Sequence, residues 1–142
     1  QQQADTSFPS NAKAFLPGFS DGNALMDYYR NNPIDVFVNC SSTEGTSVAI
    51  MEAMSCGVPL VASDTAPVRE VVQHEQQGLL VDFFSPEQLA LACMRLLDDK
   101  PLAERLRRAA RETIVQHYAL KDLLPKHVAL VDQVVARGVI AL

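Results

Sequence analysis

Short apolar runs alternate with amphipathic segments along most of the chain. Three runs rich in Val, Leu and Phe are typical of strands and cover residues 35–39, 58–62 and 79–81. A fourth candidate strand, Lys13 to Leu16, is followed by Pro17-Gly18, which would end it. Because these runs are apolar nearly throughout, they favour a parallel sheet that is covered by helices on both faces.

Helical periodicity fills the segments between and after these runs. Two predicted helices cover residues 23–30 and 46–55. Four more are predicted to begin near Pro67, Ser85, Asp99 and Leu120. The last of them extends to Ala136 and could kink at Pro125. Strands that alternate with helices predict an α/β fold of three layers, α/β/α, followed by carboxyl-terminal helices.

Composition and charge exclude several classes of protein. The chain has 142 residues, 48% of them hydrophobic, and no apolar run approaches the roughly 20 residues of a membrane span. Its net charge is −5, and residues 1–94 carry only Lys13, Arg30 and Arg69 as basic residues, which argues against a nucleic-acid-binding domain. The polar start has no signal-peptide pattern and no Met, so we expect the chain to begin inside a longer protein or to have been trimmed.

The cysteines and histidines do not predict a metal site or a cofactor. Cys40, Cys56 and Cys93 are far apart and form no CxxC pair, so we expect three free, buried thiols in a reducing, cytoplasmic compartment. The three histidines are scattered, with no second ligand at metal-binding spacing.

The loop at residues 39–47 is the strongest candidate for a binding site. Ligands of parallel sheets bind outside the carboxyl ends of the strands, where the next helix begins. Glu44 in this loop and Glu52, eight residues later, could each accept two hydrogen bonds from a sugar diol. The backbone N–H groups that could bind an anion between them belong to Gly45, Thr46, Ser47 and Val48. This pattern favours a nucleotide sugar, with ribose, diphosphate and hexose in sequence.

A purely structural interpretation of the same residues is open on spacing alone. Ser41 and Glu44 match a capping box that would begin a helix, and Glu52 could be an ordinary solvated helix residue. Gly45 would then lie inside that helix, at a cost of about 1 kcal/mol relative to Ala.

The longer stretch DVFVNCSSTEGTSVAIMEAMSCGVPLVASD resembles the signature of the retaining glycosyltransferases of family 4, also called group 1. The shared features are the E-x7-E pair (Glu44, Glu52), the EAM-x-x-G-x-P block at 52–59 and the following Ser-Asp. Downstream, PVREVVQHEQQGLLVDF is similar to the family's P-x-x-E-I-V…NGLLV segment, with Gln77 where Asn is usual. The resemblance covers about residues 11–117 and is specific from 36 to 81.

The resemblance implies that residues 13–118 form part of the donor-binding, Rossmann-like domain of a GT-B enzyme. This domain would be truncated at its amino-terminal end, with 1–12 as a tail or linker and 119–142 as a carboxyl-terminal helix. In the family the first Glu of the pair binds the donor hexose and the second binds the ribose diol, which assigns these roles to Glu44, as the catalytic residue, and to Glu52. Backbone amides from Gly45 to Val48 would bind the diphosphate, and the nucleobase would lie near residues 15–18.

The implied activity is transfer of a hexose from a UDP- or GDP-sugar to a saccharide or lipid-linked acceptor, with retention and without a metal or cofactor, in polysaccharide biosynthesis. The alternatives are a non-catalytic nucleotide-sugar-binding fragment and a GT-B-type nucleotide-sugar epimerase. The family's phosphate-binding Arg and Lys have no counterpart here, and Arg69 is interpreted as an ion-pair residue or a phosphate contact. We therefore expect the isolated chain, without its amino-terminal domain, to be inactive.

Two surface features predict associations. In the usual strand order 3-2-1-4-5-6 the run at 35–39 would expose an unpaired edge, which predicts a dimer through that edge or loose attachment of residues 1–32. The arginines near 105–111 are interpreted as a solvated helix face, but they could also contact an anionic membrane at the inner face of the cell.

Overall fold

The computed structural model describes residues 11–14, 18, 21–42 and 47–138, and a parallel sheet lies at its centre. The three strands of the sheet are β1 (Phe37–Asn39), β2 (Leu60–Ser63) and β3 (Leu79–Val81), in the order β1-β2-β3. Each strand lies in or overlaps one of the predicted apolar runs. Lys13 and Ala14, the described half of the fourth candidate strand, adopt no regular structure, and the other half lies outside the described residues.

The helices follow the predicted order closely. They are α1 (Gly22–Asn31), α2 (Val48–Ser55), α3 (Ala66–Arg69), α4 (Pro86–Asp98), α5 (Lys100–His117) and α6 (Leu120–Ala136). The sequence signals at their starts are used: Ser85 accepts a hydrogen bond from the Gln88 N–H, and Asp99 accepts one from the Leu102 N–H. Pro67 lies in the first turn of α3. Helix α6 continues through Pro125, which lies within it.

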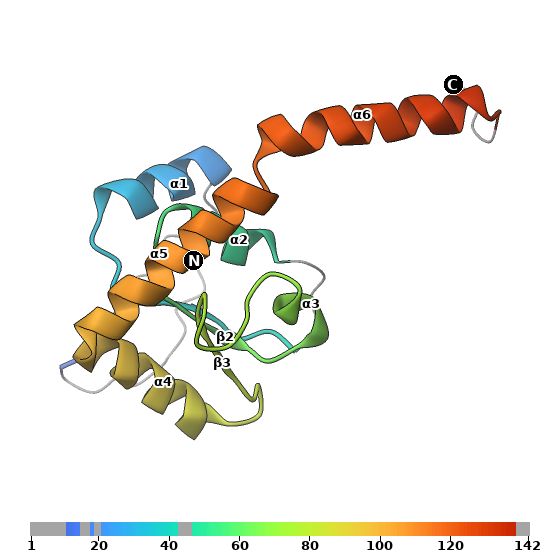
Figure 1. Cartoon of the computed structure of the whole chain (residues 1–142). Helices are drawn as coiled ribbons and strands as arrows, with labels where there is room; N and C mark the ends of the chain where they lie inside the picture. The colour runs from blue at the N-terminus through green and yellow to red at the C-terminus, as the bar shows by residue number, and fades with distance from the viewer. Residues whose placement is uncertain (1–10, 15–17, 19–20, 43–46, 139–142) are drawn as a thin grey trace.

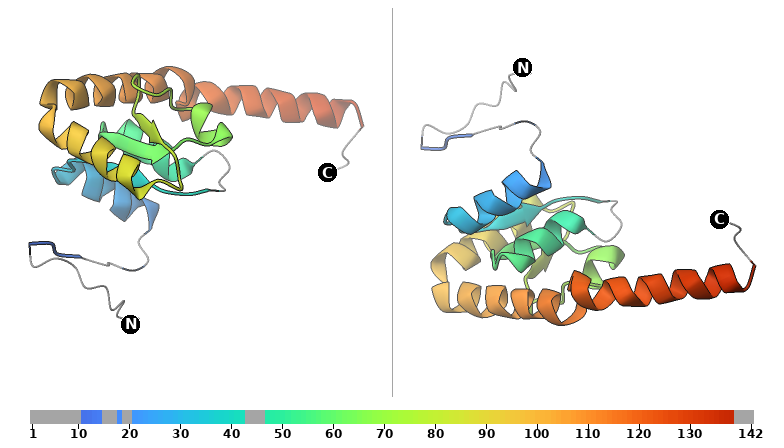
Figure 2. Two further views of the ribbon diagram at one scale, coloured as in Figure 1. Left: turned by 90° about the horizontal axis from the view of Figure 1, so that it is seen from below. Right: turned by 90° about the horizontal axis from the view of Figure 1, so that it is seen from above.

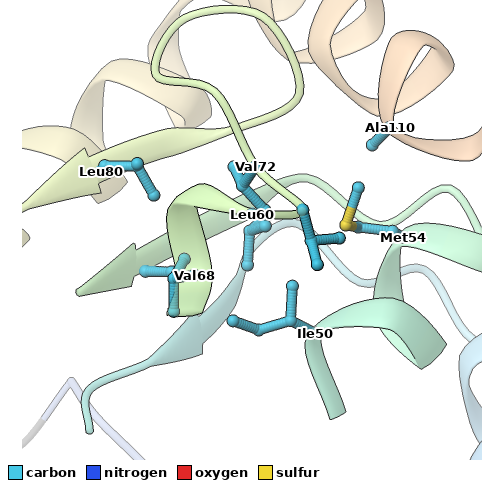
Figure 3. Packing of buried hydrophobic residues seen from close by; sticks show 9 residues of the cluster. Ile50, Met54, Leu60, Val68, Val72, Leu80 and Ala110 are labelled. Carbon is cyan, nitrogen blue, oxygen red and sulfur yellow. The ribbon is translucent and has the colours of Figure 1, made fainter. Parts of the chain in front are cut away.

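Two apolar clusters, one on each face of the sheet, make the fold a three-layer α/β/α structure. Figure 1 shows α1 and α2 above the sheet and α4 below it. Strand β2 is buried along its whole length, because its side chains point alternately to the two faces. The upper cluster contains Ile50, Met54, Leu60, Ala62, Val68, Val71, Val72, Leu80 and Ala110 (Figure 3). The lower cluster contains Val61, Leu79, Val81, Ala92, Leu96, Leu102, Ala103 and Leu106. Since α5 contributes to both clusters, it joins the two outer layers.

The carboxyl-terminal helix differs from the other long helices in its burial. Helix α6 extends away from the sheet and its covering helices, as both views of Figure 2 show. None of its residues is buried, and it exposes several large apolar side chains: Leu120, Leu124, Val128, Leu130, Val131 and Val135. No helix among the described residues has the length and apolar character needed to cross a bilayer.

The cysteines are free, but their predicted burial is wrong. Cys40 is exposed, because it follows β1 at the edge of the described sheet, and Cys56 and Cys93 are only half-buried. The position of β1 at that edge agrees with the expected strand order. Dimerisation through the edge stays a prediction.

Substituting Gly78 with alanine should destabilise the fold by about 1–3 kcal/mol. A Cβ at this position would lie 3.0 Å from the Leu60 carbonyl oxygen and 3.1 Å from Leu60 Cδ2, in the central strand. At Gly22, by contrast, a Cβ would meet only Glu52 Oε1, at 4.0 Å. Urea unfolding of Gly78→Ala and of Gly22→Ala as control measures the difference, and equal stabilities would contradict the packing argument.

Candidate functional site

The amino-terminal end of α2 lies beyond the carboxyl end of β1, where the sequence places the binding loop. Ser47 is the N-cap of α2, and its hydroxyl accepts a hydrogen bond from the Ile50 N–H at 3.5 Å. The Asn39 side-chain amide at the end of β1 donates to the same hydroxyl at 3.4 Å. The first-turn N–H groups of a helix have no partner within the helix, so this end of α2 can bind an anion.

Glu52 lies on the second turn of α2 and faces the start of α1. Its Oε1 is 4.0 Å from the position that a Cβ of Gly22, the first residue of α1, would occupy. Glu52 as a residue is half-buried, and within the described part of the chain its carboxylate accepts no hydrogen bond and forms no ion pair. The Glu52 carboxylate is therefore available to a ligand, and its predicted role in binding the ribose stays a prediction.

Three of the predicted site residues, Glu44, Gly45 and Thr46, lie outside the described residues. Their contacts with Glu52, and the common cavity predicted for the two glutamates, stay predictions. The capping-box alternative is wrong for α2, because Ser47 caps this helix and its first residue is Val48. The segment proposed to contact the nucleobase is described only at Gly18, which has a positive φ of 76°.

Small polar side chains gather at the carboxyl ends of β1 and β2. The Ser63 hydroxyl donates to the Asn39 carbonyl at 3.5 Å and links the two strand ends. The hydroxyl oxygen of Thr65, just beyond β2, is buried and has no hydrogen-bond partner among the described residues. Buried hydroxyls normally have a hydrogen-bond partner, so the Thr65 hydroxyl is available to a further segment of protein or to a ligand.

Arg69 forms an ion pair, which agrees with the first of the two interpretations offered from the sequence. Its Nε and Nη2 bind Asp64 Oδ1 and Oδ2 at 2.6 and 2.8 Å, a bidentate pair across the start of α3. The guanidinium holds the pKa of the Asp64 carboxyl below its usual range, mainly through these hydrogen bonds. Because two N–H groups of the Arg69 guanidinium already donate to Asp64, Arg69 is a poor counter-charge for a diphosphate.

Tyr29 is a residue near Glu52 that the sequence did not single out. Its ring packs edge-on against Phe37, with centroids 6.1 Å apart. Burial raises the pKa of the Tyr29 phenol, and the charges of Glu52 and Cys56 raise it further. Asp21, whose side chain accepts from the Ala24 N–H, begins α1 beside Glu52 and was also missed. An Asp-Gly pair directly before an amphipathic segment is the signal that could have identified this helix start.

Tyr29→Phe should make the protein less sensitive to alkali. The raised pKa means that the unfolded chain releases the phenol proton near pH 10, while the folded chain retains it. The contribution of the protonated Tyr29 to the free energy of unfolding is therefore complete below about pH 10, and it is lost as the pH rises toward the folded pKa. The free energy of unfolding, measured with urea between pH 9 and 11, should fall less steeply with pH for Tyr29→Phe than for wild type. Tyr28→Phe, an exposed control, should follow wild type. Parallel slopes for all three proteins would contradict the assignment.

The described residues contain no candidate metal centre. Within residues 11–14, 18, 21–42 and 47–138, no three His, Cys, Asp or Glu residues are grouped so that they could hold a metal ion.

The family model and the related sequences that match this chain indicate the same family. The family model described as "Glycosyl transferases group 1" matches residues 6–113. The lipopolysaccharide core biosynthesis glycosyltransferase LpsD of Rhizobium meliloti is 34% identical over 103 residues, which cover 72% of this chain and 30% of LpsD. An uncharacterized glycosyltransferase of Methanocaldococcus jannaschii is 28% identical over 111 residues, 78% of this chain and 28% of the relative. The chain spans less than a third of the length of either protein.

Solved structures agree with the sequence comparison. Sucrose-phosphate synthase from Thermosynechococcus elongatus superimposes with a TM-score of 0.78 at 30% identity, over 84% of this chain and 30% of the synthase. Anabaena HepE, crystallised with UDP-glucose, has a TM-score of 0.67 at 22% identity over 70% of this chain and 28% of HepE, which supports the fold alone. The Rossmann-like GT-B expectation is confirmed, and the chain belongs to the group 1 glycosyltransferase family.

Proposed function

We propose that this chain is the donor-binding domain of a retaining glycosyltransferase that uses a nucleotide diphosphate sugar. The observation that carries the proposal is the Glu52 carboxylate, half-buried beside the start of α1 and without a hydrogen-bond donor in the described part of the chain. A vicinal diol supplies two hydroxyl donors that such a carboxylate lacks. Ribose carries this diol, and the start of α2, where the diphosphate would bind, lies about one turn of helix away.

The chemistry proposed is electrostatic. The bond between the anomeric carbon and the diphosphate oxygen breaks, and its electron pair leaves with the nucleoside diphosphate. The acceptor oxygen bonds to the same carbon on the same face, and its proton passes to the departing phosphate. The N–H groups at the start of α2, with Ser47 and Val48, would stabilise the negative charge of the leaving group, and Glu44 would orient the hexose.

The acceptor is proposed to be a saccharide or a lipid-linked sugar, and it would bind mainly to residues outside this chain. Relatives give this proposal its support. Among them is a GDP-mannose-dependent phosphatidylinositol monomannoside mannosyltransferase of Mycobacterium tuberculosis, 34% identical over 83 residues. With Arg69 occupied by Asp64, the chain offers little positive charge to the diphosphate. We therefore propose that the isolated chain binds donor weakly and does not transfer sugar.

Calorimetry with UDP, GDP, UDP-glucose and GDP-mannose tests the donor-binding role. Saturable binding of one nucleotide and its sugar is expected, with the nucleoside monophosphate binding more weakly because it lacks one phosphate. If neither this chain nor a longer protein that contains it binds any nucleotide, the proposal fails. Incubation of that longer protein with donor and acceptor separates the alternatives. A transferase forms a glycoside with the donor's anomeric configuration, an epimerase releases an altered sugar, and a binding fragment does neither.

A further inference from the structure

A hollow lies at the opposite end of α2 from Ser47. Its volume is about 550 Å³, and it opens between the carboxyl-terminal ends of α1 and α2 and the side of α5. Its lining includes Tyr29, Arg30, Asp35, Ser55, Arg107 and Arg111. Since α2 extends from the carboxyl end of β1 back to this hollow, the hollow is separate from the start of α2 proposed to bind the diphosphate, although Tyr29, which lies near Glu52, is part of its lining.

The hollow is positively charged, although the whole chain has a net charge of −5. Three guanidinium groups line it, against the single carboxylate of Asp35, which is 3.6 Å from Lys100 Nζ. Arg107 binds Glu104 at 2.6 Å, and Arg30 makes only a long contact of 3.5 Å with Asp27. Arg111 forms neither an ion pair nor a hydrogen bond within the described part of the chain. A group of guanidiniums with spare donors is the arrangement that binds phosphate.

These arginines are not needed to cap the two helices that end at the hollow. At the end of α1, the side-chain amides of Asn31 and Asn32 donate to the Asp27 and Tyr28 carbonyls at 2.8 and 2.9 Å. At the end of α2, the Ser55 hydroxyl donates to the Glu52 carbonyl at 2.7 Å, and the Gly57 N–H donates to the Met54 carbonyl. These carbonyls take their hydrogen bonds from amide and hydroxyl groups and not from the arginines, so Arg111 and the spare donors of Arg30 and Arg107 remain for an external anion.

We propose that this hollow, which we call the arginine pocket, binds a phosphorylated sugar. Arg111 and Arg30, with the outer N–H groups of Arg107, would hold the phosphate. Ser55 and Asn32 each donate a hydrogen bond within the protein but retain an oxygen that can accept from sugar hydroxyls, and Asp35 adds a carboxylate. The Tyr29 ring and Pro33 provide an apolar wall for the C–H face of the ring.

Titration of the ¹⁵N-labelled chain with inorganic phosphate and with glucose 1-phosphate tests the proposal. Saturable shifts of the Cys56, Gly57 and Val58 amides are expected, with tighter binding of the sugar phosphate than of phosphate alone. Arg111→Gln should weaken binding at least about tenfold, the effect of losing one charge-assisted hydrogen bond. Arg108→Gln, an exposed change on the same helix that lies outside the pocket lining, should leave the affinity within about twofold.

Three outcomes would overturn the proposal. The first is no saturable shift of the pocket amides at millimolar ligand. The second is an equal loss of affinity in Arg108→Gln and Arg111→Gln, which would indicate non-specific attraction to the basic face of α5. The third is equal affinity for phosphate and for the sugar phosphate, which would leave no role for the hydroxyl acceptors. Shifts confined to Ser47 and Val48 would report the donor site instead, so failure here does not affect the donor-binding proposal.

Discussion

Glu52→Ala should weaken binding of UDP or GDP by about a hundredfold, the combined effect of two hydrogen bonds between a carboxylate and a ribose diol. The carboxylate is half-buried, near the first residue of α1, and has no protein donor among the described residues, so the alanine change leaves no protein group unpaired. Calorimetry with the 2′-deoxynucleotide gives a second readout. Removal of one hydroxyl should weaken binding to wild type and have little effect on binding to Glu52→Ala.

The same substitution should not destabilise the protein. Loss of a half-buried, unpaired charge is neutral or stabilising in the absence of ligand, which is the usual relation between stability and function at a binding site. Glu112→Ala, an exposed change on α5, is the matched control and should alter neither nucleotide affinity nor unfolding. Full nucleotide affinity in Glu52→Ala would remove the ribose assignment, and a large loss of stability would show that Glu52 has a structural role.

Met54→Ala should lower the free energy of unfolding by about 3 kcal/mol, within the range of core truncations that leave a cavity. Met54 is fully buried in the upper cluster, where it packs with Leu60 and with Ala110 of α5 (Figure 3). For a chain of this size, Tm should fall by roughly 10 °C.

Met94→Ala is the matched control for this change. Met94 lies on α4 with 56% of its surface exposed, so its truncation should change stability by less than about 0.5 kcal/mol. The comparison requires only urea or thermal unfolding followed by circular dichroism. Similar losses in both variants would mean that the upper cluster is not the core of the fold.

The order of the elements could be predicted from the sequence, because its signals are local. Ser85 with Pro86 and Asp99 with Pro101 fix the starts of α4 and α5, and both helices begin there. Strand lengths were less certain, since burial of β2 on both faces removes the alternation that would mark its ends. The burial of the cysteines was predicted from residue type alone, and Cys40 is exposed just after β1, whose outer edge pairs with no strand among the described residues.

The candidate site could be predicted only in part. The spacing of Glu44 and Glu52 and the family resemblance pointed to α2, and Ser47, Val48 and Glu52 lie there. The contribution of α1 could not be foreseen, because Gly22 and Tyr29 reach Glu52 through the packing of two helices and not through sequence spacing. The arginine pocket is another product of packing: Arg30 and Arg111 are distant in sequence and line one hollow only after α1 and α5 have both assembled around α2.

The purely parallel sheet affects how the protein can fold during its synthesis on the ribosome. The two strand pairings join residues about twenty positions apart, Phe37 with Leu60 and Val61 with Leu79, and no hairpin joins the paired strands. A ribosome must therefore release α2 and β2 before β1 can pair with β2, and β3 and α5 before the two clusters close. Contacts of such long separation form slowly. During synthesis, the apolar residues of β1 thus lack their β2 partners until the intervening helix has been made.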